Sequence, residues 1–319
     1  MENRPAVSVI VPAYNEISCL GRCLDSLERQ TLRKIELILV DDGSDDGTGE
    51  WMDRRAAEDA RIVVIHRENG GLSAARNTGI KAASAQYIMF VDADDAVRED
   101  FCGLAYENIT KYDADIALFG MCERSRRGRI RRTVSAGDIP EGLVDRETAM
   151  KLLCGKVGAM AWNKIYRKSL FDKVLFPEGH VFEDVATTYR LILLADRISC
   201  LGEALYDRYL RKGSITATWT PGYANEKFDA RMKRALHLRK IGFDEDLIRK
   251  EAVTAAFLYV KMVRPANGGA RMRIAERILR NCRHAPDFLP RKQKLLFLLY
   301  RYCRPVFDLL YDSTKRQAG

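Results

Sequence analysis

Three carboxylates stand within four residues in the segment 91–95, which reads Val-Asp-Ala-Asp-Asp. The segment follows an apolar run over residues 87–91, so it falls at the carboxyl end of a predicted strand. Carboxylates this close repel one another unless a cation lies among them, and Mg²⁺ or Mn²⁺ binds one or two protein carboxylates together with substrate phosphates. Asp92 and Asp94 are therefore candidates for a metal–diphosphate site. The alternative is a solvated turn in which an Asp, with Asp95 best placed, caps the next helix.

A second acidic cluster lies at residues 40–48, with the sequence Val-Asp-Asp-Gly-Ser-Asp-Asp-Gly-Thr. Its glycines allow a tight backbone turn, and a carboxylate here can accept a hydrogen bond from a base N–H or a ribose hydroxyl. Turn and helix-capping roles explain most of these residues, with Ser44 or Asp45 as the expected N-cap. Asp41, which comes directly after an apolar run, is the residue that we expect to bind ligand.

Residues 69–77 read Asn-Gly-Gly-Leu-Ser-Ala-Ala-Arg-Asn. A Gly-Gly turn that opens a helix offers backbone N–H groups to an anion, and Arg76 stands one turn into that helix. Because small residues surround Arg76, we expect its side chain to be buried against an anionic partner. A Gly-Gly turn alone is weak evidence, and it gains weight here from the two acidic clusters.

These clusters must be positioned by the elements that precede them. Apolar runs predict strands over residues 7–11, 35–40, 62–65 and 87–91. Amphipathic periodicity predicts helices over residues 17–29, 45–58 and 72–83. This alternation predicts a doubly wound α/β sheet that is mostly parallel, in which ligands bind beyond the carboxyl ends of the strands. The polar groups of interest all fall at those ends, at residues 14–16, 41–44, 69–71 and 92–95.

The pattern loosens after residue 115. We expect a strand over 116–119, helices over 145–154 and 184–195, and short strands near 198–210. The charge run at 123–132 (Glu-Arg-Ser-Arg-Arg-Gly-Arg-Ile-Arg-Arg) is typical of a solvated hairpin or loop. From residue 225 the pattern is helical, with breaks at 265–269 and 286–290. We therefore predict two domains, residues 1–220 and residues 221–319.

Four motifs stand in order along the chain: residues 8–16 (Ser-Val-Ile-Val-Pro-Ala-Tyr-Asn-Glu), 40–44 (Val-Asp-Asp-Gly-Ser), 69–77 and 91–95. In sequence and spacing they resemble glycosyltransferase family 2, and the resemblance covers roughly the first 215 residues. It implies a GT-A fold, Rossmann-like with a mixed sheet, followed here by a helical C-terminal extension. It also implies an inverting, metal-dependent enzyme that moves a sugar from a nucleoside diphosphate, most often UDP, to an acceptor hydroxyl.

The resemblance also implies roles for individual residues. Those that would hold the base and ribose, or lie near them, are Pro12, Tyr14, Glu16, Asp41, Asn69 and Arg76. Asp94 would be the main ligand of Mn²⁺ or Mg²⁺, and Asp92 would contact the ribose or the metal. The segment 209–216 is similar to the family's mobile loop, in which Arg211 and Ser214 would close over the diphosphate. Residues 162–164 (Trp-Asn-Lys) resemble a family feature on the acceptor side.

The segment 176–185 contains the pair Glu183 and Asp184 and is similar to the family's segment at the start of a helix. Inverting transfer needs a carboxylate that takes the proton of the acceptor hydroxyl. We assign that base to Asp184, with Glu183 orienting the acceptor or the base. The alternative is that both are first-turn acids that interact with the helix dipole.

The charge of the chain is unevenly distributed. Residues 225–319 hold 22 Lys and Arg against 10 Asp and Glu, so this third is +12 in a chain of +9, and residues 1–224 are −3. A basic region suits an anionic membrane, an anionic polymer or nucleic acid, but no nucleic-acid-reading motif is recognisable, so we expect no nucleic-acid partner. The mixed apolar and basic segment 292–310 favours a helix on an anionic membrane. The alternative is a helix packed on the catalytic domain or on another subunit.

No apolar run approaches the roughly 18 residues of a membrane-spanning helix, and the N-terminus lacks the features of a secretory signal. The Gln-x-x-Arg-Trp signature of processive family members is absent. We therefore expect a cytoplasmic, single-addition glycosyltransferase, peripheral at the inner face of the cytoplasmic membrane. Its expected substrates are a UDP-sugar and a cell-surface or lipid-linked glycan, and its oligomeric state stays open.

Two rival functions are compatible with parts of the pattern. A nucleotidyltransferase also uses metal-bound carboxylates on a doubly wound sheet, but it would need a Gly-rich, basic loop after the first strand, where this chain has residues 12–16 (Pro-Ala-Tyr-Asn-Glu). A scaffold without activity would bind membranes or anionic polymers through the basic C-terminal region. Such a scaffold should have lost its acidic motifs, yet Asp92, Asp94 and Asp184 are all present.

Overall fold

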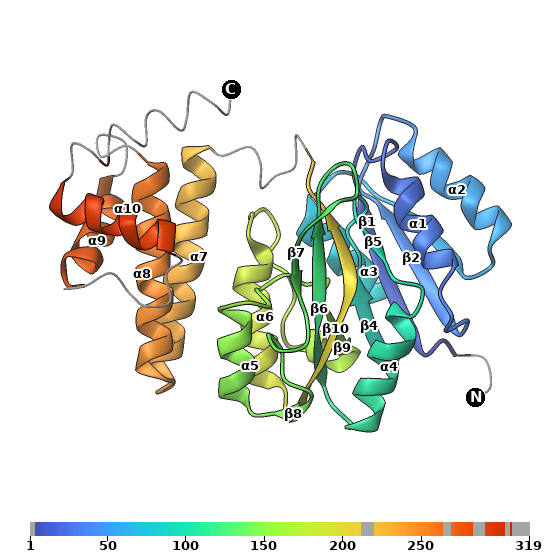
Figure 1. Cartoon of the computed structure of the whole chain (residues 1–319). Helices are drawn as coiled ribbons and strands as arrows, with labels where there is room; N and C mark the ends of the chain where they lie inside the picture. The colour runs from blue at the N-terminus through green and yellow to red at the C-terminus, as the bar shows by residue number, and fades with distance from the viewer. Residues whose placement is uncertain (1–3, 212–219, 264–268, 283–290, 304–306, 308–319) are drawn as a thin grey trace. The chain divides into compact units, whose positions relative to one another are not determined.

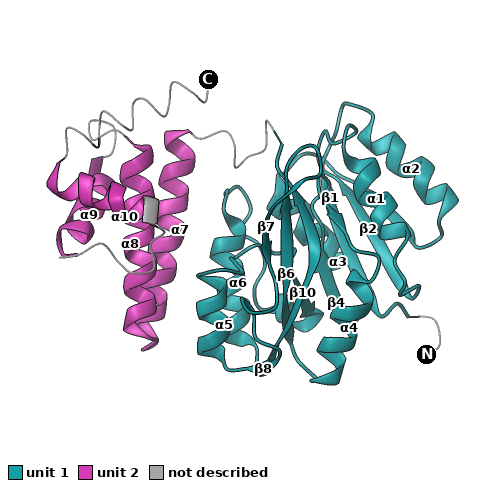
Figure 2. Cartoon of the chain, viewed as in Figure 1, with its two compact units in different colours: residues 1–217 teal, residues 218–319 magenta. Residues whose placement is uncertain are grey.

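The computed structural model describes residues 4–211, 220–263, 269–282, 291–303 and 307. The chain forms two compact units, residues 1–217 and residues 218–319 (Figure 2). The first is an α/β unit built around a sheet, and the second is helical (Figure 1).

Within the described residues, the α/β unit holds a ten-stranded sheet with the order β3-β2-β1-β4-β9-β6-β10-β5, and β7 pairs with β6 and β8 with β10. The strands are β1 (Val7–Ala13), β2 (Ile35–Asp41), β3 (Ile62–His66), β4 (Tyr87–Phe90), β5 (Ala96–Val97), β6 (Ile116–Arg124), β7 (Ile130–Val134), β8 (Gly142–Val144), β9 (Lys164–Arg167) and β10 (Ile198–Tyr209). The strands β3, β2, β1 and β4 are parallel, whereas β9 lies antiparallel between β4 and β6. The mixed sheet that the resemblance implied is confirmed. Beyond β4, the strand β10 pairs in parallel with β6, whereas β9, β7, β8 and β5 pair antiparallel with their neighbours.

Helices cover both faces of the sheet, and Figure 1 shows α5 and α6 on one face with α1, α2 and α4 on the other. Their bounds are α1 (Leu20–Glu28), α2 (Thr48–Glu58), α3 (Leu72–Ala82), α4 (Phe101–Lys111), α5 (Arg146–Leu153) and α6 (Glu183–Leu194), with a short 3-10 helix at Lys168–Asp172. The helices predicted over 17–29 and 45–58 begin three residues later than predicted, at Leu20 and Thr48, because the residues before them form the loops of the site. Helix α4 and the strands β5, β8 and β9 were not predicted, and the short strands expected near 198–210 form the single strand β10.

Strand β1 forms the centre of the parallel half of the sheet. All seven of its residues are buried, which is why its sequence is apolar at every position except Ser8 and does not alternate. Helix α3 packs closely on this strand at Gly79, where a Cβ atom would come within 2.3 Å of the side chain of Ile10. This close contact fixes α3, and therefore Arg76, against the central strand.

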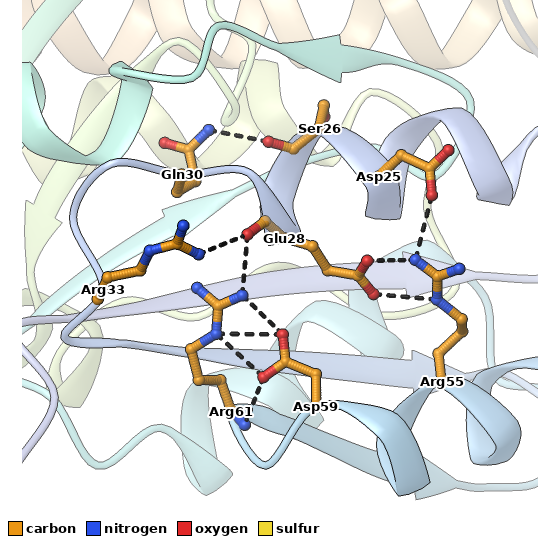
Figure 3. Close-up of polar contacts among 8 residues, drawn as sticks. All are labelled: Asp25, Ser26, Glu28, Gln30, Arg33, Arg55, Asp59 and Arg61. Atoms are coloured by element: carbon orange, nitrogen blue, oxygen red, sulfur yellow. Dashed lines mark hydrogen bonds and ion pairs between the residues drawn. The ribbon is translucent and has the colours of Figure 1, made fainter.

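An ion-pair network fastens α1 to α2 and to the loop before β3 (Figure 3). Arg55 of α2 donates from Nη2 to Asp25 at 3.1 Å and from Nε to Glu28 at 3.0 Å, both on α1. Arg61 donates from Nη2 to the backbone carbonyl of Glu28 at 3.0 Å and pairs with Asp59 at 2.6 Å. These contacts hold together the helices that follow the first two site loops.

The second unit consists, in its described part, of α7 (Pro221–Lys240), α8 (Glu245–Met262), α9 (Gly269–Arg280) and α10 (Arg291–Tyr302). Its apolar core includes Phe228, Phe257 and Phe297. Arg234 and Glu251 form a fully buried ion pair between α7 and α8, with Nε of the arginine 3.0 Å from Oε2 of the glutamate. Among the described residues, no helix has the length and apolar character needed to cross a membrane. The predicted breaks at 265–269 and 286–290 lie outside the described residues except for residue 269, and the predicted segment 292–310 is described only over residues 292–303 and at residue 307.

A candidate active site of paired carboxylates and arginines

The loops that follow β1 and β2 are joined at one edge of the sheet. The two strands are paired as far as Ala13 and Asp41. Beyond them, the backbone N–H of Asn15 donates to Oγ of Ser44 at 3.0 Å, and the N–H of Asp45 donates to Oδ1 of Asn15 at 2.9 Å. The first two polar groups singled out in the sequence are therefore in direct contact.

Arg211 joins the first polar group to the fourth. Its Nε donates to Oδ2 of Asp94 at 2.6 Å, and its Nη2 donates to Oε1 of Glu16. Burial raises the pKa of Asp94 and the nearby charge of Asp92 raises it further, while Arg211 lowers it. Arg211 thus supplies the positive charge that these crowded carboxylates require.

Arg76 joins the acidic cluster after β4 to the start of α6. Its side chain is 3% exposed, as we expected from its small neighbours, and Nη2 donates to Oδ1 of Asp92 at 2.8 Å while Nη1 donates to Oε1 of Glu183. The anionic partners that the sequence required are therefore two carboxylates. Burial raises the pKa of Glu183, and the ion pair with Arg76 opposes that rise. Within the described residues, Nε of Arg76 is buried without a hydrogen-bond partner.

Asp95 has a structural role, although not the one predicted. It is buried, and its two oxygens accept hydrogen bonds from the hydroxyl of Tyr206 at 2.8 Å and the backbone N–H of Tyr209 at 2.7 Å. The next helix begins at Phe101 after Asp100, so Asp95 does not cap it. Asp95 instead attaches the acidic loop to β10, two residues before Arg211.

Asp41 at the end of β2 is held by two neighbours. Oδ1 accepts from the backbone N–H of Ser44 at 3.0 Å, and Oδ2 lies 2.9 Å from Nδ1 of His66, whose Nε2 lies 3.1 Å from Asp53. Hydrogen bonds to these two carboxylates raise the pKa of His66. Gly49 leaves room for the pair, since a Cβ atom there would lie 2.6 Å from Oδ2 of Asp41. Sequence reasoning missed His66, because a single histidine at a strand end forms no recognisable pattern.

The cap of α2 also differs from the prediction. Its N-cap residue is Gly47, with a left-handed backbone (φ 91°), and Asp46 accepts the N–H of Thr48 at 3.0 Å. The predicted cap, Ser44 or Asp45, is wrong because the helix begins at Thr48, after a turn over residues 44–46 that binds the loop after β1.

The Gly-Gly turn is bound to the protein itself. The N–H groups of Gly70 and Gly71 donate to Asp42 at 3.1 and 2.7 Å, so the anion that they bind is a carboxylate of the protein and not a ligand phosphate as we predicted. The turn lies very close to Gly43, whose left-handed backbone (φ +77°) and missing Cβ allow the N–H of Asn69 to approach. Asp42 thus fixes the third polar group against the second.

The segment 157–161 is fastened at five successive carbonyl groups. Each accepts a hydrogen bond from a side chain: Val157 from Asn163 (2.9 Å), Gly158 from Lys164 (3.2 Å), Ala159 from Thr188 (2.9 Å), Met160 from Lys164 (2.7 Å) and Ala161 from Tyr166 (3.1 Å). Asn163 and Lys164 are fully buried. Their side chains therefore do not line the acceptor side as the resemblance implied, but hold the backbone of this segment.

Asp184 lies on the first turn of α6 and is partly exposed. Burial raises its pKa, while the charges of Arg76 and Lys164 lower it. A carboxylate with a raised pKa is a stronger proton acceptor, which suits a general base. Thr188, one turn later, donates to the carbonyls of both Asp184 and Ala159, at 2.8 and 2.9 Å, and so ties the segment 157–161 to this turn.

The remaining predicted positions lie around this centre. Pro12 is buried within β1, whereas Tyr14 is 49% exposed and Asn69 is exposed at the turn after β3. Trp162 is buried and stacks on Tyr206, with ring centroids 4.1 Å apart. Ser214 lies outside the described residues.

The carboxylates fit a divalent ion that draws further ligands from a substrate. Among the described residues, no group of three or more His, Cys, Asp or Glu side chains gathers into a metal cage. Asp92 and Asp94 together would supply the one or two protein oxygens that Mg²⁺ or Mn²⁺ takes when a diphosphate completes its shell. Burial raises the pKa of Asp94 first and the charge of Asp92 raises it further, so a cation that binds beside these two carboxylates would lower it again.

The sequence of the chain is similar to those of known glycosyltransferases. The model of the family described as Glycosyl transferase family 2 matches residues 8–175. Glycosyltransferase GlyA of Streptococcus pneumoniae is 34% identical over 271 residues, which are 83% of this chain and 38% of that protein. Glycosyltransferase GlyG of the same organism is 34% identical over 223 residues, 66% of this chain and 73% of that protein. The chain thus spans well under half of GlyA and most of GlyG.

Solved structures show the same fold. Residues 1–349 of Staphylococcus aureus TarS, in complex with UDP-GlcNAc, superpose with a TM-score of 0.66 at 21% identity, covering 98% of this chain and 92% of that one. A mannosyltransferase from Pyrobaculum calidifontis, in complex with GDP-Man and Mn²⁺, gives a TM-score of 0.52 at 19% identity, covering 88% and 75%. The likeness confirms the predicted GT-A α/β fold with its mixed sheet and helical C-terminal part.

Proposed function

The chain belongs to glycosyltransferase family 2, and on this premise we propose that it transfers a sugar from a UDP-sugar to a hydroxyl group of a cell-surface or lipid-linked glycan. The transfer proceeds with inversion and with a divalent metal ion. A UDP donor is supported by the fold shared with TarS, which binds UDP-GlcNAc. A polymeric surface acceptor is supported by sequence similarity to the S. aureus poly(ribitol-phosphate) β-N-acetylglucosaminyltransferase TarS, 28% identical over 261 residues.

One contact carries the proposal. Arg76 binds Asp92 of the acidic motif and Glu183 of α6 at the same time, and Glu183 immediately precedes Asp184. The arginine thereby fixes a candidate base on α6 at a set place relative to the motif that would hold the donor. A nucleotide site and a base held by one buried side chain are what a single-displacement transfer needs.

In the proposed reaction Asp184 accepts the proton of the acceptor hydroxyl as that oxygen bonds to the anomeric carbon. The bond from this carbon to the diphosphate breaks on the opposite side, UDP leaves, and the configuration inverts. Glu183 stays paired with Arg76 and orients the turn that carries the base. Asp92 and Asp94 would hold Mg²⁺ or Mn²⁺, and the bound ion would neutralise charge on the leaving diphosphate.

The same arrangement suggests which residues would contact the donor. Pro12, Tyr14, Glu16, Asp41 and Asn69 are the proposed neighbours of the base and ribose. Nε of Arg76 still has a hydrogen to donate. Arg211, once released from Asp94, and Ser214 are the proposed partners of the diphosphate.

The C-terminal region, residues 221–319, is proposed to hold the enzyme at an anionic membrane on the cytoplasmic side. Helix α10 exposes Leu295 and Tyr302, 59% and 69% exposed, next to the basic residues Lys294 and Arg301. Apolar side chains flanked by basic ones are the combination that binds anionic lipid surfaces. The variant Leu295→Gln with Tyr302→Gln should sediment less with phosphatidylglycerol vesicles than the wild type. Equal sedimentation would refute this role of α10.

Donor hydrolysis tests the transferase activity. Release of free nucleoside diphosphate would be measured for a panel of nucleotide sugars, with and without Mn²⁺, for the wild type and Asp94→Ala. Slow, metal-dependent turnover of one donor that disappears in the variant supports the proposal and identifies the sugar. If no donor is cleaved and calorimetry detects no binding of UDP with Mn²⁺, the proposal is wrong and a scaffold role is favoured.

A further inference from the structure

The hairpin formed by β6 and β7 carries a concentration of positive charge that the proposed reaction does not use. Residues 123–132 contain six arginines and one glutamate, a net charge of +5, inside a region of 224 residues with a net charge of −3. The charge run alone is typical of a solvated hairpin, and the hairpin is confirmed: β6 ends at Arg124 and β7 begins at Ile130. The structure shows which elements the hairpin contacts and which of its arginines form ion pairs.

Only part of this charge serves the fold. Arg124 pairs with Asp207 on β10 at 2.7 Å and donates to the carbonyl of Gly128 at 3.1 Å, so it closes the hairpin. The side chains that remain are exposed, and within the described residues none of them pairs with a carboxylate: Arg126, Arg127, Arg129, Arg131 and Arg132. Five like charges on one short hairpin repel one another, and an anionic ligand would relieve that repulsion.

The base of the hairpin adjoins the candidate active site. Arg124 is in register with Tyr209 of β10, and the N–H of Leu210 donates to the carbonyl of Arg124 at 2.9 Å. The next residue, Arg211, is the one that binds Asp94. The arginine-rich strands therefore leave the sheet directly beside the segment that reaches the acidic motif.

The second strand of the hairpin reaches the base side of the site. Arg132 lies opposite Glu123, and its Nη2 is 3.5 Å from the carbonyl of Lys156. Lys156 immediately precedes the segment 157–161, which Thr188 ties to the turn of Asp184. The hairpin therefore contacts one segment that leads to Asp94 and another that is tied to the turn of Asp184.

We propose that the hairpin β6–β7 is the docking surface for an anionic acceptor, a glycan chain that bears phosphate or carboxylate groups along its length. The inference rests on the proposed transferase function. All five exposed cations of the hairpin are arginines, whose planar guanidinium groups bind phosphate and carboxylate oxygens in pairs. A chain that bears one charge per repeat engages several arginines at once, and its terminal hydroxyl lies toward Asp184.

A lipid surface fits this hairpin less well. Membrane-binding elements bury a stripe of apolar side chains in the interface beside their basic residues. Within residues 123–134, Ile130 is the single exposed large apolar side chain. The hairpin therefore has the charge for an anionic partner without the apolar area that insertion into lipid requires.

Binding of a defined polyanion tests the proposal in the full-length protein. The hairpin variant is Arg127→Gln, Arg129→Gln and Arg131→Gln, and the probes are fluorescein-labelled inorganic polyphosphate, polygalacturonate and neutral dextran. The matched control removes three exposed arginines from α9 instead: Arg273→Gln, Arg277→Gln and Arg280→Gln. It separates the hairpin from the basic C-terminal region.

We expect the hairpin variant to bind polyphosphate roughly tenfold more weakly than the wild type, with a weaker dependence on salt. The α9 control should keep at least half of the wild-type affinity, neutral dextran should not bind, and polygalacturonate separates a preference for phosphate from one for any anion. Donor hydrolysis without acceptor should be unchanged in the hairpin variant, because none of its three residues contacts the donor side.

Three results would overturn the docking proposal. One is equal polyphosphate binding by the hairpin variant and the wild type, and another is loss of binding in the α9 control alone. The third is loss of phosphatidylglycerol-vesicle binding in the hairpin variant with polyphosphate binding retained, which would identify a membrane contact. If the wild type neither hydrolyses a donor nor binds UDP with Mn²⁺ while the hairpin still binds polyphosphate, the proposed transferase function fails and the docking surface stands.

Discussion

Nε of Arg211 donates a 2.6 Å hydrogen bond to Oδ2 of Asp94, and the same guanidinium group also binds Glu16. The carboxylate predicted to be the main metal ligand is therefore bound by a cation of the protein itself. A metal ion and Arg211 would compete for Asp94, because both neutralise the same charge. A donor that brings its own diphosphate offers Arg211 a new partner, so arrival of donor and metal together would release this competition.

The first prediction concerns that competition. Arg211→Ala should bind Mn²⁺ in the absence of donor roughly tenfold more tightly than the wild type, a change of about 1.4 kcal/mol. The reason is that Asp94 and Glu16 lose their cation. Calorimetry or electron paramagnetic resonance of Mn²⁺ measures it. Arg208→Ala, which removes an arginine three residues earlier that pairs with Glu123 at 3.4 Å, is the control. Equal affinities in the two variants would refute the competition.

The second prediction concerns the buried bridge. Arg76→Met should lower the free energy of unfolding by about 3–5 kcal/mol, because it leaves the carboxylates of Asp92 and Glu183 without their buried partner. Urea unfolding measures the loss. Arg98→Met removes a pair with Asp100 in which the arginine is 44% exposed, and it should cost less than about 1 kcal/mol. Similar losses in both variants would show that burial of the Arg76 pair has no special weight.

The sequence predicted the parallel half of the sheet well, because strands such as Val7–Ala13 are short runs in which nearly every residue is apolar and all are buried. Convergence of the first two polar groups also follows from sequence, since the carboxyl ends of paired parallel strands meet at one edge. The burial of Arg76 was predictable from its small neighbours. Its choice of Asp92 and Glu183 was not, because residues 76 and 183 meet only through the fold.

The predictions from sequence were wrong where a polar group could form hydrogen bonds with several equivalent partners. Ser44, Asp45 and Asp46 are all good caps, and all three bind the loop after β1, so the residue that accepts the helix N–H depends on where the turn ends and not on residue type. The N–H groups of Gly70 and Gly71 could have bound a ligand phosphate, but they donate to the carboxylate of Asp42. Strand β9 was missed since a segment of four residues pairs antiparallel without any periodicity of its own.

The third prediction concerns pH and His66. Its pKa is raised by hydrogen bonds to Asp41 and Asp53, so the protonated imidazole stabilises the fold at low pH and this stabilisation is lost as the pH rises through the folded-state pKa. The difference in melting temperature between the wild type and His66→Asn should therefore shrink above neutral pH. The affinity for UDP should fall over the same range, since Asp41 loses a charged donor.

Removal of one partner of this histidine gives the matched comparison. Asp53→Asn should lower the pKa of His66, so the stabilisation of the fold by the protonated imidazole should be lost at a lower pH than in the wild type. Melting curves of the three proteins from pH 5 to pH 9 test it. If the difference between the wild type and His66→Asn stays constant with pH, the imidazole does not change its charge in this range.

The last prediction concerns Lys164 beneath the base. Burial lowers its pKa from the ordinary value of 10.5 to about 7. Between these two values the unfolded chain binds a proton that the folded chain does not, so the free energy of unfolding should rise with pH across this window, by up to about 1.4 kcal/mol per pH unit. Below the folded-state pKa both states carry the proton, and the full cost of burying the charge is present.

Lys164→Met should remove that slope, because methionine fills a similar volume and binds no proton. The free energy of the wild type relative to this variant should therefore increase from pH 7 toward pH 10, as urea unfolding would measure. Lys111→Met, which removes an exposed lysine on α4, controls for the loss of a charge. Parallel pH curves for the wild type and Lys164→Met would show that Lys164 is charged throughout. In that case the ammonium group holds the carbonyls of Gly158 and Met160, and acts on Asp184, as a permanent cation.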